Sequence, residues 1–337
     1  MKIVVYDIAA RKGGGGETIL NQYFDIAENE PETEWWFIVS IMDCWKRELP
    51  NIHVIFVDTA KASKLKRYTY RKKYELFELK RIIEIINPDE LISLQNMPVP
   101  GVKCKQTVYL HQSLMFSPVK YRFTVREERS LAFRQRVICG LIRKNLCKAD
   151  KVIVQTNWMK DAVIEWADYP EERIIVEAPK VVLPACTKQN NRLNNTFIYP
   201  ANAYPYKNHQ VILEACRILK EQGIKDYKIK FTISPDSGGL AGKLLEESNR
   251  EELPIEYIGK LDREELFKHY QTMITLFPSY IETFGLPLLE AKSAEGRIIA
   301  SDSPFAHEIL GEYEFAEFVN WNDSKGWASA ILNKLKQ

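Results

Sequence analysis

The sequence predicts two consecutive α/β domains, each a doubly wound parallel sheet, facing each other across a cleft. Its 337 residues exceed what one ordinary hydrophobic core needs and suit two domains of roughly 150 residues each. Short apolar runs alternate with amphipathic helical stretches, which is typical of parallel strands covered by helices on both faces. The alternation stops once, in a polar stretch rich in Asn, and then starts again.

The N-terminal Rossmann-like domain is expected over residues 1–183. Seven apolar runs of strand length predict its sheet. They are KIVVYDI (2–8), EWWFIVSI (34–41), HVIFVD (53–58), ELISLQ (90–95), QTVYLHQ (106–112), KVIVQT (151–156) and RIIVEAP (173–179).

A linker is expected over residues 184–195, where Pro, Asn and charged residues interrupt the pattern. The C-terminal Rossmann-like domain is expected over 196–337. Whether its last helix packs on the N-terminal domain is left open. Five runs predict its strands: TFIYPAN (196–202), YKIKFTISP (227–235), IEYIGKL (255–261), MITLFPS (273–279) and RIIASDS (297–303). Ligands of such sheets bind beyond the carboxyl ends of the strands, so the cleft is the expected site.

Composition restricts the function class. A hydrophobic fraction of 45%, a charged fraction of 27% and a net charge of +2 are those of a globular protein with no general affinity for nucleic acid. Six Cys without metal-ligand spacing fit a reducing compartment. A strand from the second residue leaves no room for a signal peptide, and no apolar run reaches the ~20 residues of a membrane span. A cytoplasmic protein is therefore expected.

Four consecutive glycines, Gly13–Gly16, follow the first strand and open a helix. The spacing fits neither the dinucleotide fingerprint nor the phosphate-binding P-loop. A flexible backbone at a helix N-terminus can approach an anionic ligand closely. A tight strand-to-helix turn with no ligand is the alternative, and glycine alone does not decide between them.

The segment LFPSYIETFGLPLLEAKSAEGRIIASDSPFAHEIL (276–310) carries the strongest functional signal. Its strand ends at Pro278 and a helix begins near Pro287, a residue preorganised for the first helical position. Amides before that helix favour a phosphate, and Glu282 and Glu290 stand on either side of the glycine. Two carboxylates bracketing an anion pocket suit a nucleotide sugar. Ordinary solvated or dipole-favoured glutamates are the alternative.

At these residues the sequence resembles the retaining glycosyltransferases of GT-B fold, the family-4-like group also called glycosyl transferases group 1. ETFGLPLLE is similar to the E-x7-E signature of that family, with Glu282 and Glu290 as its glutamates. The resemblance implies that Glu290 holds the ribose hydroxyls of the donor and that Glu282 lies near the donor sugar in a catalytic role. The amides of Thr283, Phe284, Gly285 and Leu286 would contact the sugar or diphosphate.

Upstream, YPANAYPYKNHQVILEA resembles the family's loop that grips the diphosphate through an Arg and a Lys. Lys207 matches the Lys, whereas Asn202 occupies the Arg position. Lys260, Arg263 or a basic residue of the first domain is expected to compensate. The loop 258–261 is expected to contact the nucleobase.

In the first domain, QTVYLHQSLMFSP resembles the family strand that ends in a His facing the donor sugar, which nominates His111 as catalytic. A buried core histidine is the alternative. ADKVIVQTNWMKDAV resembles the last strand of the first domain in this family and the helix that follows it. This resemblance places Thr156 near the cleft. The glycine loop, through Gly14 and Gly15, would then border the donor phosphates.

No metal and no cofactor are expected, because the chain lacks the D-x-D that a GT-A enzyme uses to hold a divalent ion. The resemblance implies a retaining, metal-independent transfer of a sugar from a nucleotide-sugar donor to a glycan or lipid-linked glycan, in surface polysaccharide biosynthesis. A catalytically silent GT-B subunit and a nucleotide-sugar epimerase remain alternatives, and Asn202 favours the former.

Two stretches combine basic and aromatic residues. Residues 61–81 hold nine Lys or Arg against two Glu, and residues 120–145 form the second stretch. Basic clusters near an anionic bilayer contribute about 1 kcal/mol per residue. Peripheral contact with the inner face of the membrane is expected, and a well-solvated basic face is the alternative.

Overall fold

The computed structural model describes residues 1–10, 12, 15–59, 70, 73–184 and 192–336. Its contacts divide into two units: Met1–Gln112 with Val137–Val181, and Ser113–Arg136 with Val182–Gln337. Gly13, Gly14, most of the expected linker and residues 60–69 of the first basic stretch lie outside the described residues. Residues 113–136 lie within the expected N-terminal domain but group by contacts with the second unit.

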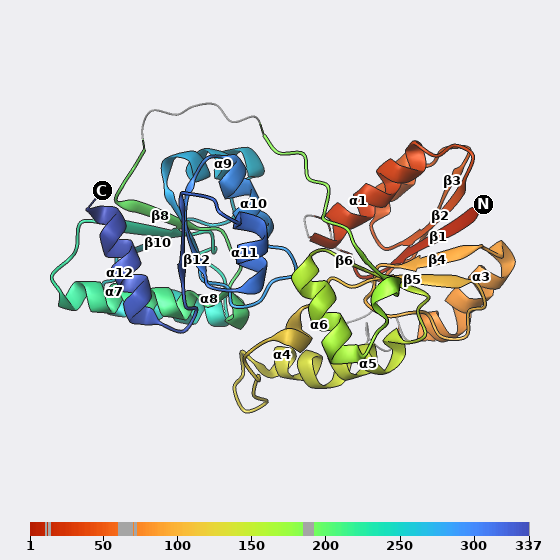
Figure 1. Cartoon of the computed structure of the whole chain (residues 1–337), viewed down its shortest axis with the longest axis horizontal. Helices are drawn as coiled ribbons and strands as arrows, with labels where there is room; N and C mark the ends of the chain where they lie inside the picture. The colour runs from red at the N-terminus through yellow and green to blue at the C-terminus, as the bar shows by residue number, and fades with distance from the viewer. Residues whose placement is uncertain (11, 13–14, 60–69, 71–72, 185–191, 337) are drawn as a thin grey trace. The chain divides into compact units, whose positions relative to one another are not determined.

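The first unit contains a seven-stranded parallel sheet in the order β3-β2-β1-β4-β5-β6-β7 (Figure 1). All seven predicted strands are present, each shorter than predicted, and β3 and β5 begin one residue before the predicted start. They are β1 (Lys2–Asp7), β2 (Glu34–Val39), β3 (Ile52–Phe56), β4 (Glu90–Ser93), β5 (Lys105–Tyr109), β6 (Lys151–Val154) and β7 (Ile174–Val176).

Helices cover both faces of this sheet. In chain order they are α1 (Gly15–Glu28), the 3-10 turn η1 (Met42–Arg47), the π-helical η2 (Tyr74–Leu79), α3 (Lys80–Ile86), α5 (Cys139–Leu146), α6 (Asn157–Ala167) and η5 (Glu171–Arg173). Three further helices, η3 (Leu114–Phe116), α4 (Arg129–Phe133) and η4 (Arg134–Ile138), lie in or at the edge of the segment that groups with the second unit.

Successive side chains of β1 point alternately into the two hydrophobic cores of the first unit. Ile3 and Val5 are buried in the cluster that contains the apolar face of α1. Val4 and Tyr6 point the other way, into the cluster that contains α3. Because successive side chains of a strand face opposite sides, a continuous apolar run is what a sheet covered on both faces requires.

The second unit contains a six-stranded parallel sheet in the order β10-β9-β8-β11-β12-β13. Its strands are β8 (Thr196–Tyr199), β9 (Lys228–Phe231), β10 (Ile255–Tyr257), β11 (Ile274–Phe277), β12 (Arg297–Ser301) and β13 (Ala316–Val319). The sequence analysis did not predict β13. This edge strand is mostly half-buried and contains Glu317, so it lacks the uninterrupted apolar run that revealed the others.

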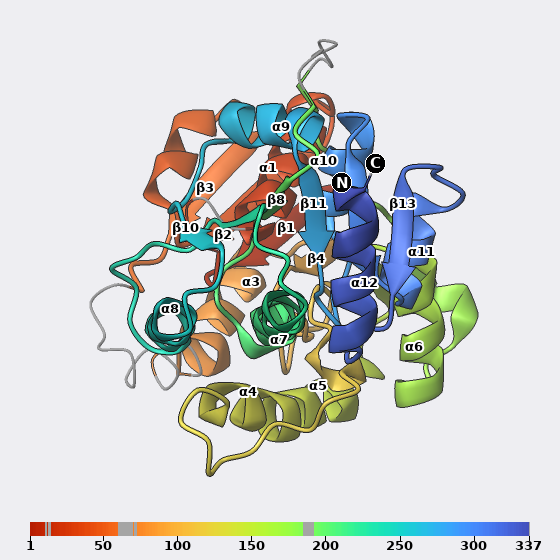
Figure 2. The ribbon, with the colours of Figure 1, turned by 90° about the vertical axis from the view of Figure 1, so that its left-hand side faces the viewer.

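Two helical layers enclose the second sheet. Its helices are η6 (Pro205–Lys207), α7 (His209–Glu221), α8 (Leu240–Arg250), α9 (Arg263–Thr272), α10 (Leu286–Ser293), α11 (Pro304–Leu310) and α12 (Ser324–Leu335). Helix α7 packs with α8 and α12, and α10 packs with α9 and α11 (Figure 2). The sequence left open whether the last helix packs on the N-terminal domain. In the structure this helix, α12, packs on α7 and β13 of its own unit.

The strand order reverses within the second unit, between β8 and β11. Strands β8 and β11 are neighbours, yet the chain leaves β8 toward α7 and leaves β11 toward α10, which belong to opposite layers. At such a reversal of strand order the two following loops diverge, and ligands of doubly wound sheets bind there. These are the loops that carry the predicted residues Lys207 and Glu282.

Candidate active site

The loops after β8 and β11 are bound to one another. The amide of Tyr280 donates to the carbonyl oxygen of Tyr206 at 3.1 Å. The side-chain amide of Asn208 donates to the carbonyl oxygens of Pro278, at 3.3 Å, and Trp321, at 2.7 Å. Beneath them, the buried Tyr199 hydroxyl lies 3.0 Å from the Ser279 hydroxyl. Both loops are therefore held in place before any ligand binds.

Lys207 and Glu282 face each other from these two loops. The Lys207 ammonium donates to Oε1 of Glu282, and the two side chains are only 17% and 16% exposed. The ammonium also lies 5.5 Å from the ring centre of Tyr206 and 5.8 Å from that of Phe277. The sequence nominated both residues separately; their pairing is a finding of the structure.

Helix α10 begins as the sequence predicts, with Gly285 at its N-cap and Pro287 in its first turn. Gly285 has φ +92°, in the left-handed region that favours glycine. The amides of Leu288 and Leu289 donate to its carbonyl oxygen. Within the described part of the chain, the amides of Phe284, Gly285 and Leu286 donate to no acceptor. Three donors thus remain for a ligand at the helix start.

Glu290 lies on the next turn of α10, with its side chain 13% exposed. Its Oε1 accepts from Nε of Arg263 at 3.1 Å, and its Oε2 accepts from the Tyr270 hydroxyl at 3.3 Å. Burial raises the pKa of the Glu290 carboxyl, and Arg263 and Tyr270 act in the opposite direction. The carboxylate is therefore held from both oxygens by one helix, α9.

The other nominated residues of this unit lie in the loops after β8 and β10, at the start of α9 and in the segment that precedes α10. Asn202 is exposed in the loop after β8, where its carbonyl oxygen accepts from the amide of Tyr204. Lys260 is exposed and has no ion pair among the described residues. Thr283 is half-buried before the helix. Arg263, one of the expected substitutes for the missing Arg, contacts Glu290 instead of standing free.

His111 follows β5 in the first unit. Its amide donates to Oδ1 of Asn96 at 2.8 Å, and its Nε2 lies 3.4 Å from Nδ2 of the same Asn. The side chain is half-buried at the carboxyl end of the sheet. Thr156 is buried at the N-cap of α6.

Gly16, in the described part of the glycine loop, lies close to the buried carboxylate of Asp7. Asp7 ends β1 and accepts from the amides of Ala9, at 2.8 Å, and Ala10, at 2.9 Å. A Cβ on Gly16 would lie 3.9 Å from Oδ2 of Asp7, whereas one on Gly15 would meet nothing within 4 Å. The sequence analysis missed Asp7, although a carboxylate that ends an apolar strand was a visible signal.

A segment distant in sequence completes the surroundings of Glu282. Tyr121 is buried, and its hydroxyl lies 3.0 Å from the hydroxyl of Tyr280. Glu127 of the same segment pairs with Lys243 of α8 at 2.7 Å. Residues 113–136 therefore support the loop after β11, a role that no sequence pattern indicated.

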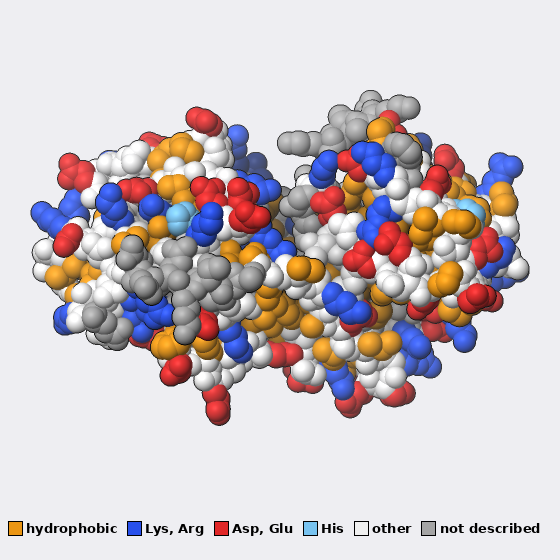
Figure 3. Space-filling model, turned by 90° about the horizontal axis from the view of Figure 1, so that it is seen from above, with side chains coloured by type: hydrophobic (Ala, Val, Ile, Leu, Met, Phe, Trp, Pro, Cys, Tyr) orange, Lys and Arg blue, Asp and Glu red, His pale blue; other side chains and the backbone are white. Residues whose placement is uncertain are grey.

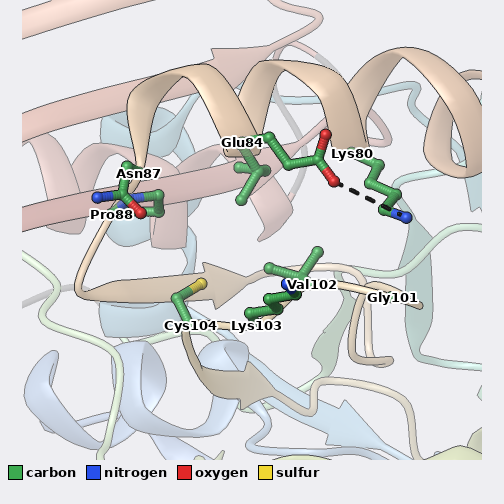
Figure 4. A pocket seen from close by; sticks show the side chains of 9 residues that line it. Lys80, Glu84, Asn87, Pro88, Gly101, Val102, Lys103 and Cys104 are labelled. Atoms are coloured by element: carbon green, nitrogen blue, oxygen red, sulfur yellow. Dashed lines mark ion pairs between the residues drawn. The ribbon is translucent and has the colours of Figure 1, made fainter.

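A pocket of about 400 Å³ lies elsewhere in the first unit (Figure 4). Residues of α3 and residues just before β4 and β5 line it, among them Lys80, Asn87 and Cys104. It is thus at the amino ends of the strands, away from the edge where ligands of doubly wound sheets bind. None of the nominated residues lines it.

The two doubly wound parallel sheets define a GT-B fold. Sucrose-phosphate synthase from Thermosynechococcus elongatus superimposes with a TM-score of 0.70 at 16% identity, covering 100% of this chain and 90% of that one. The Anabaena protein HepE, solved with UDP and glucose, superimposes with a TM-score of 0.67 at 14% identity, with the same coverage.

Residues 187–337 match the model of the family of glycosyl transferases group 1. It is 25% identical over 218 residues to the O-antigen chain mannosyltransferase B of Escherichia coli, a match covering 60% of this chain and 56% of that relative. It is 24% identical over 299 residues to the O-antigen chain mannosyltransferase RfbU of Salmonella typhimurium, covering 85% and 75%. The match to mannosyltransferase B thus spans little more than half of that relative.

Among the described residues, no helix combines the length and the apolar composition needed to cross a membrane.

Proposed function

We propose that this protein is a retaining, metal-independent glycosyltransferase. It moves a sugar from a nucleotide-sugar donor to a glycan or lipid-linked glycan acceptor in surface polysaccharide biosynthesis. The two O-antigen mannosyltransferases that it resembles support activated mannose as the first donor to test.

The observation that carries this proposal is the start of α10. Three amides that donate to no acceptor in the described part of the chain, the Lys207–Glu282 pair and the Glu290 carboxylate all belong to two adjoining loops and one helix. A diphosphate suits the amides and the ammonium, because backbone donors and the helix dipole stabilise negative charge. Glu290 suits hydroxyl groups at one end of the ligand.

The proposed chemistry follows from these groups. The bond between the anomeric carbon and the diphosphate oxygen breaks, and the acceptor oxygen forms the new bond on the same face of the sugar. The acceptor proton passes to the departing phosphate oxygen. Lys207 and the amides of Phe284 to Leu286 stabilise the charge that develops on the leaving diphosphate. Neither glutamate acts as a nucleophile in this scheme.

Nucleotide binding tests the proposal first. We expect calorimetry to show that one of UDP, GDP, dTDP, ADP and CMP binds selectively, with equal affinity with and without magnesium. Glu290→Ala and Lys207→Ala are expected to abolish that binding in a protein that still unfolds cooperatively. A folded parent protein that binds none of these nucleotides would contradict the proposal and favour the silent GT-B subunit.

We propose that the protein reaches its acceptor at the inner face of the membrane. In the second basic stretch, Phe123 and Phe133 are 44% and 43% exposed, and Arg126, Arg129 and Arg134 are exposed beside them in sequence. Basic and acidic side chains are interspersed on the face shown in Figure 3. Attraction to lipid therefore rests on this local combination of aromatic and basic groups.

Liposome flotation tests the membrane contact. We expect the protein to float with vesicles that contain phosphatidylglycerol but not with phosphatidylcholine alone, and to be released by salt because the attraction is electrostatic. The double variant Phe123→Ser/Phe133→Ser is expected to bind these vesicles more weakly. Failure of the parent protein to float with anionic vesicles at low salt would contradict the idea.

A further inference from the structure

Two arginines, Arg192 and Arg297, lie close together at the amino-terminal edge of the second sheet. Arg297 is the first residue of β12, and Arg192 belongs to the last part of the expected linker. Nη2 of Arg192 donates to the carbonyl oxygen of Glu295 at 3.3 Å, and Nη2 of Arg297 donates to that of Leu193 at 3.0 Å. Nη1 of Arg297 also donates to Oδ1 of Asn194 at 2.8 Å. These hydrogen bonds make the two cations neighbours, although they are far apart in the chain.

Among the described residues, no carboxylate forms an ion pair with either arginine. Every acceptor of their hydrogen bonds is a neutral oxygen. No Asp or Glu occurs at the remaining positions of the chain, which are 11, 13–14, 60–69, 71–72, 185–191 and 337. By contrast, Arg217, Arg250 and Arg263 of the same unit each pair with a glutamate. The pair of arginines thus carries a local excess of positive charge.

This excess charge is electrostatically costly. Arg297 is half-buried, and burial together with the charge of Arg192 lowers the pKa of its guanidinium. Arg192 is exposed, and its guanidinium lies 5.7 Å from the ring centre of Phe315. Most N–H donors of both guanidiniums remain unused among the described residues. An anion that accepted from both groups would offset the repulsion between them.

We propose that Arg192 and Arg297 form a binding site for a doubly charged phosphate group. Guanidinium groups bind phosphate oxygens through paired N–H donors, and two of them match the charge of a phosphate dianion. A phosphate bound there would hold the last residues of the linker against β12.

This site is separate from the donor site of the proposed function. The strands of the second sheet are parallel, so β12 begins at the edge opposite to the one where the loops with Lys207 and Glu282 leave β8 and β11. The five residues of β12 put about 15 Å between the two edges. The proposed phosphate is therefore a second ligand and not part of the nucleotide.

Calorimetry and thermal unfolding with inorganic phosphate at pH 7.5 test this site, against sodium chloride of equal ionic strength. We expect a dissociation constant on the order of 1 mM, and a rise in Tm of about 3 °C at about 20 mM phosphate. Arg192→Gln and Arg297→Gln should each weaken phosphate binding roughly 10-fold, the cost of losing one charged hydrogen-bonding group. Arg250→Gln, which removes an arginine paired with Glu251, is the matched control and should keep the response of the parent protein.

Glucose 6-phosphate distinguishes two sources of the phosphate group. Binding tighter than that of inorganic phosphate would indicate a phosphorylated molecule as the ligand, and weaker binding would indicate the free ion. Loss of either kind of binding in Arg192→Gln and Arg297→Gln supports the site.

Three results would overturn the inference. The first is a parent protein that phosphate stabilises no more than chloride does. The second is a phosphate response that both arginine variants keep and Lys207→Met loses, which would put the ion at the start of α10. The third is an equal fall in the Tm of the arginine variants with and without phosphate, which would show that the arginines only fasten the linker to β12. Nucleotide binding is measured separately, so each of these results leaves the proposed function standing.

Discussion

Replacing Lys207 by methionine is expected to lower kcat/KM for sugar transfer by about 100- to 1000-fold, the usual cost of losing one preorganised group that stabilises a leaving oxyanion. The same change removes the partner of Glu282, whose side chain is only 16% exposed. An unpaired, largely buried carboxylate is expected to cost about 2 kcal/mol in the free energy of unfolding. Transfer kinetics and urea unfolding measure the two effects.

The double variant Lys207→Met/Glu282→Gln separates catalysis from stability. It leaves no buried charge, so its free energy of unfolding should return to within about 1 kcal/mol of the parent value. Its activity should stay low because the cation is still missing and Glu282, the nominated residue near the donor sugar, is changed as well. Recovery of transfer in the double variant would show that Lys207 only neutralises Glu282 and has no part in the reaction.

Replacing Gly285 by alanine is expected to remove nucleotide binding as well as some stability. At φ +92° a side chain costs about 1–2 kcal/mol. The new Cβ would also lie 3.4 Å from Cδ1 of Leu288 and 3.5 Å from Cδ2 of Phe305. Both distances are ordinary van der Waals contacts, so the strain at φ +92° is what would move the backbone that presents the amides of Phe284 and Leu286. We expect at least a tenfold loss of nucleotide affinity, measured by calorimetry.

Gly223→Ala is the matched control for this prediction. Gly223 follows α7 with φ +79°, and a Cβ there meets nothing within 4 Å. Its variant should lose similar stability and keep the nucleotide affinity of the parent protein. Equal affinity in Gly285→Ala and Gly223→Ala would show that the start of α10 does not hold the donor.

The fold could be predicted from local patterns to a large extent. Each buried parallel strand is an apolar run, and the break near Pro184 separated two sets of them. The start of α10 could likewise be predicted, because Gly285 and Pro287 occupy positions that favour those residue types. Strand β13 was missed because an edge strand that is only half-buried needs no continuous apolar run.

Individual candidate residues were also readable, whereas their partners were not. Glu282, Glu290 and Lys207 stand in recognisable motifs of the sequence. Their contacts join residues far apart in the chain: Glu282 lies 75 positions from Lys207, and Glu290 lies 20 positions from Tyr270. Tyr121 reaches Tyr280 over 159 positions.

There is a physical reason why the candidate residues could be predicted from the sequence and their partners could not. Strand and helix signals arise from the periodicity of neighbouring side chains and from backbone preferences, so a window of ten residues contains them. The partner of a carboxylate depends on strand order and on the packing of one helix against the next. Here the adjacency of β8 and β11 brings Lys207 to Glu282, and the packing of α9 on α10 brings Arg263 and Tyr270 to Glu290. No local pattern encodes that adjacency, which exists only once the sheet has assembled.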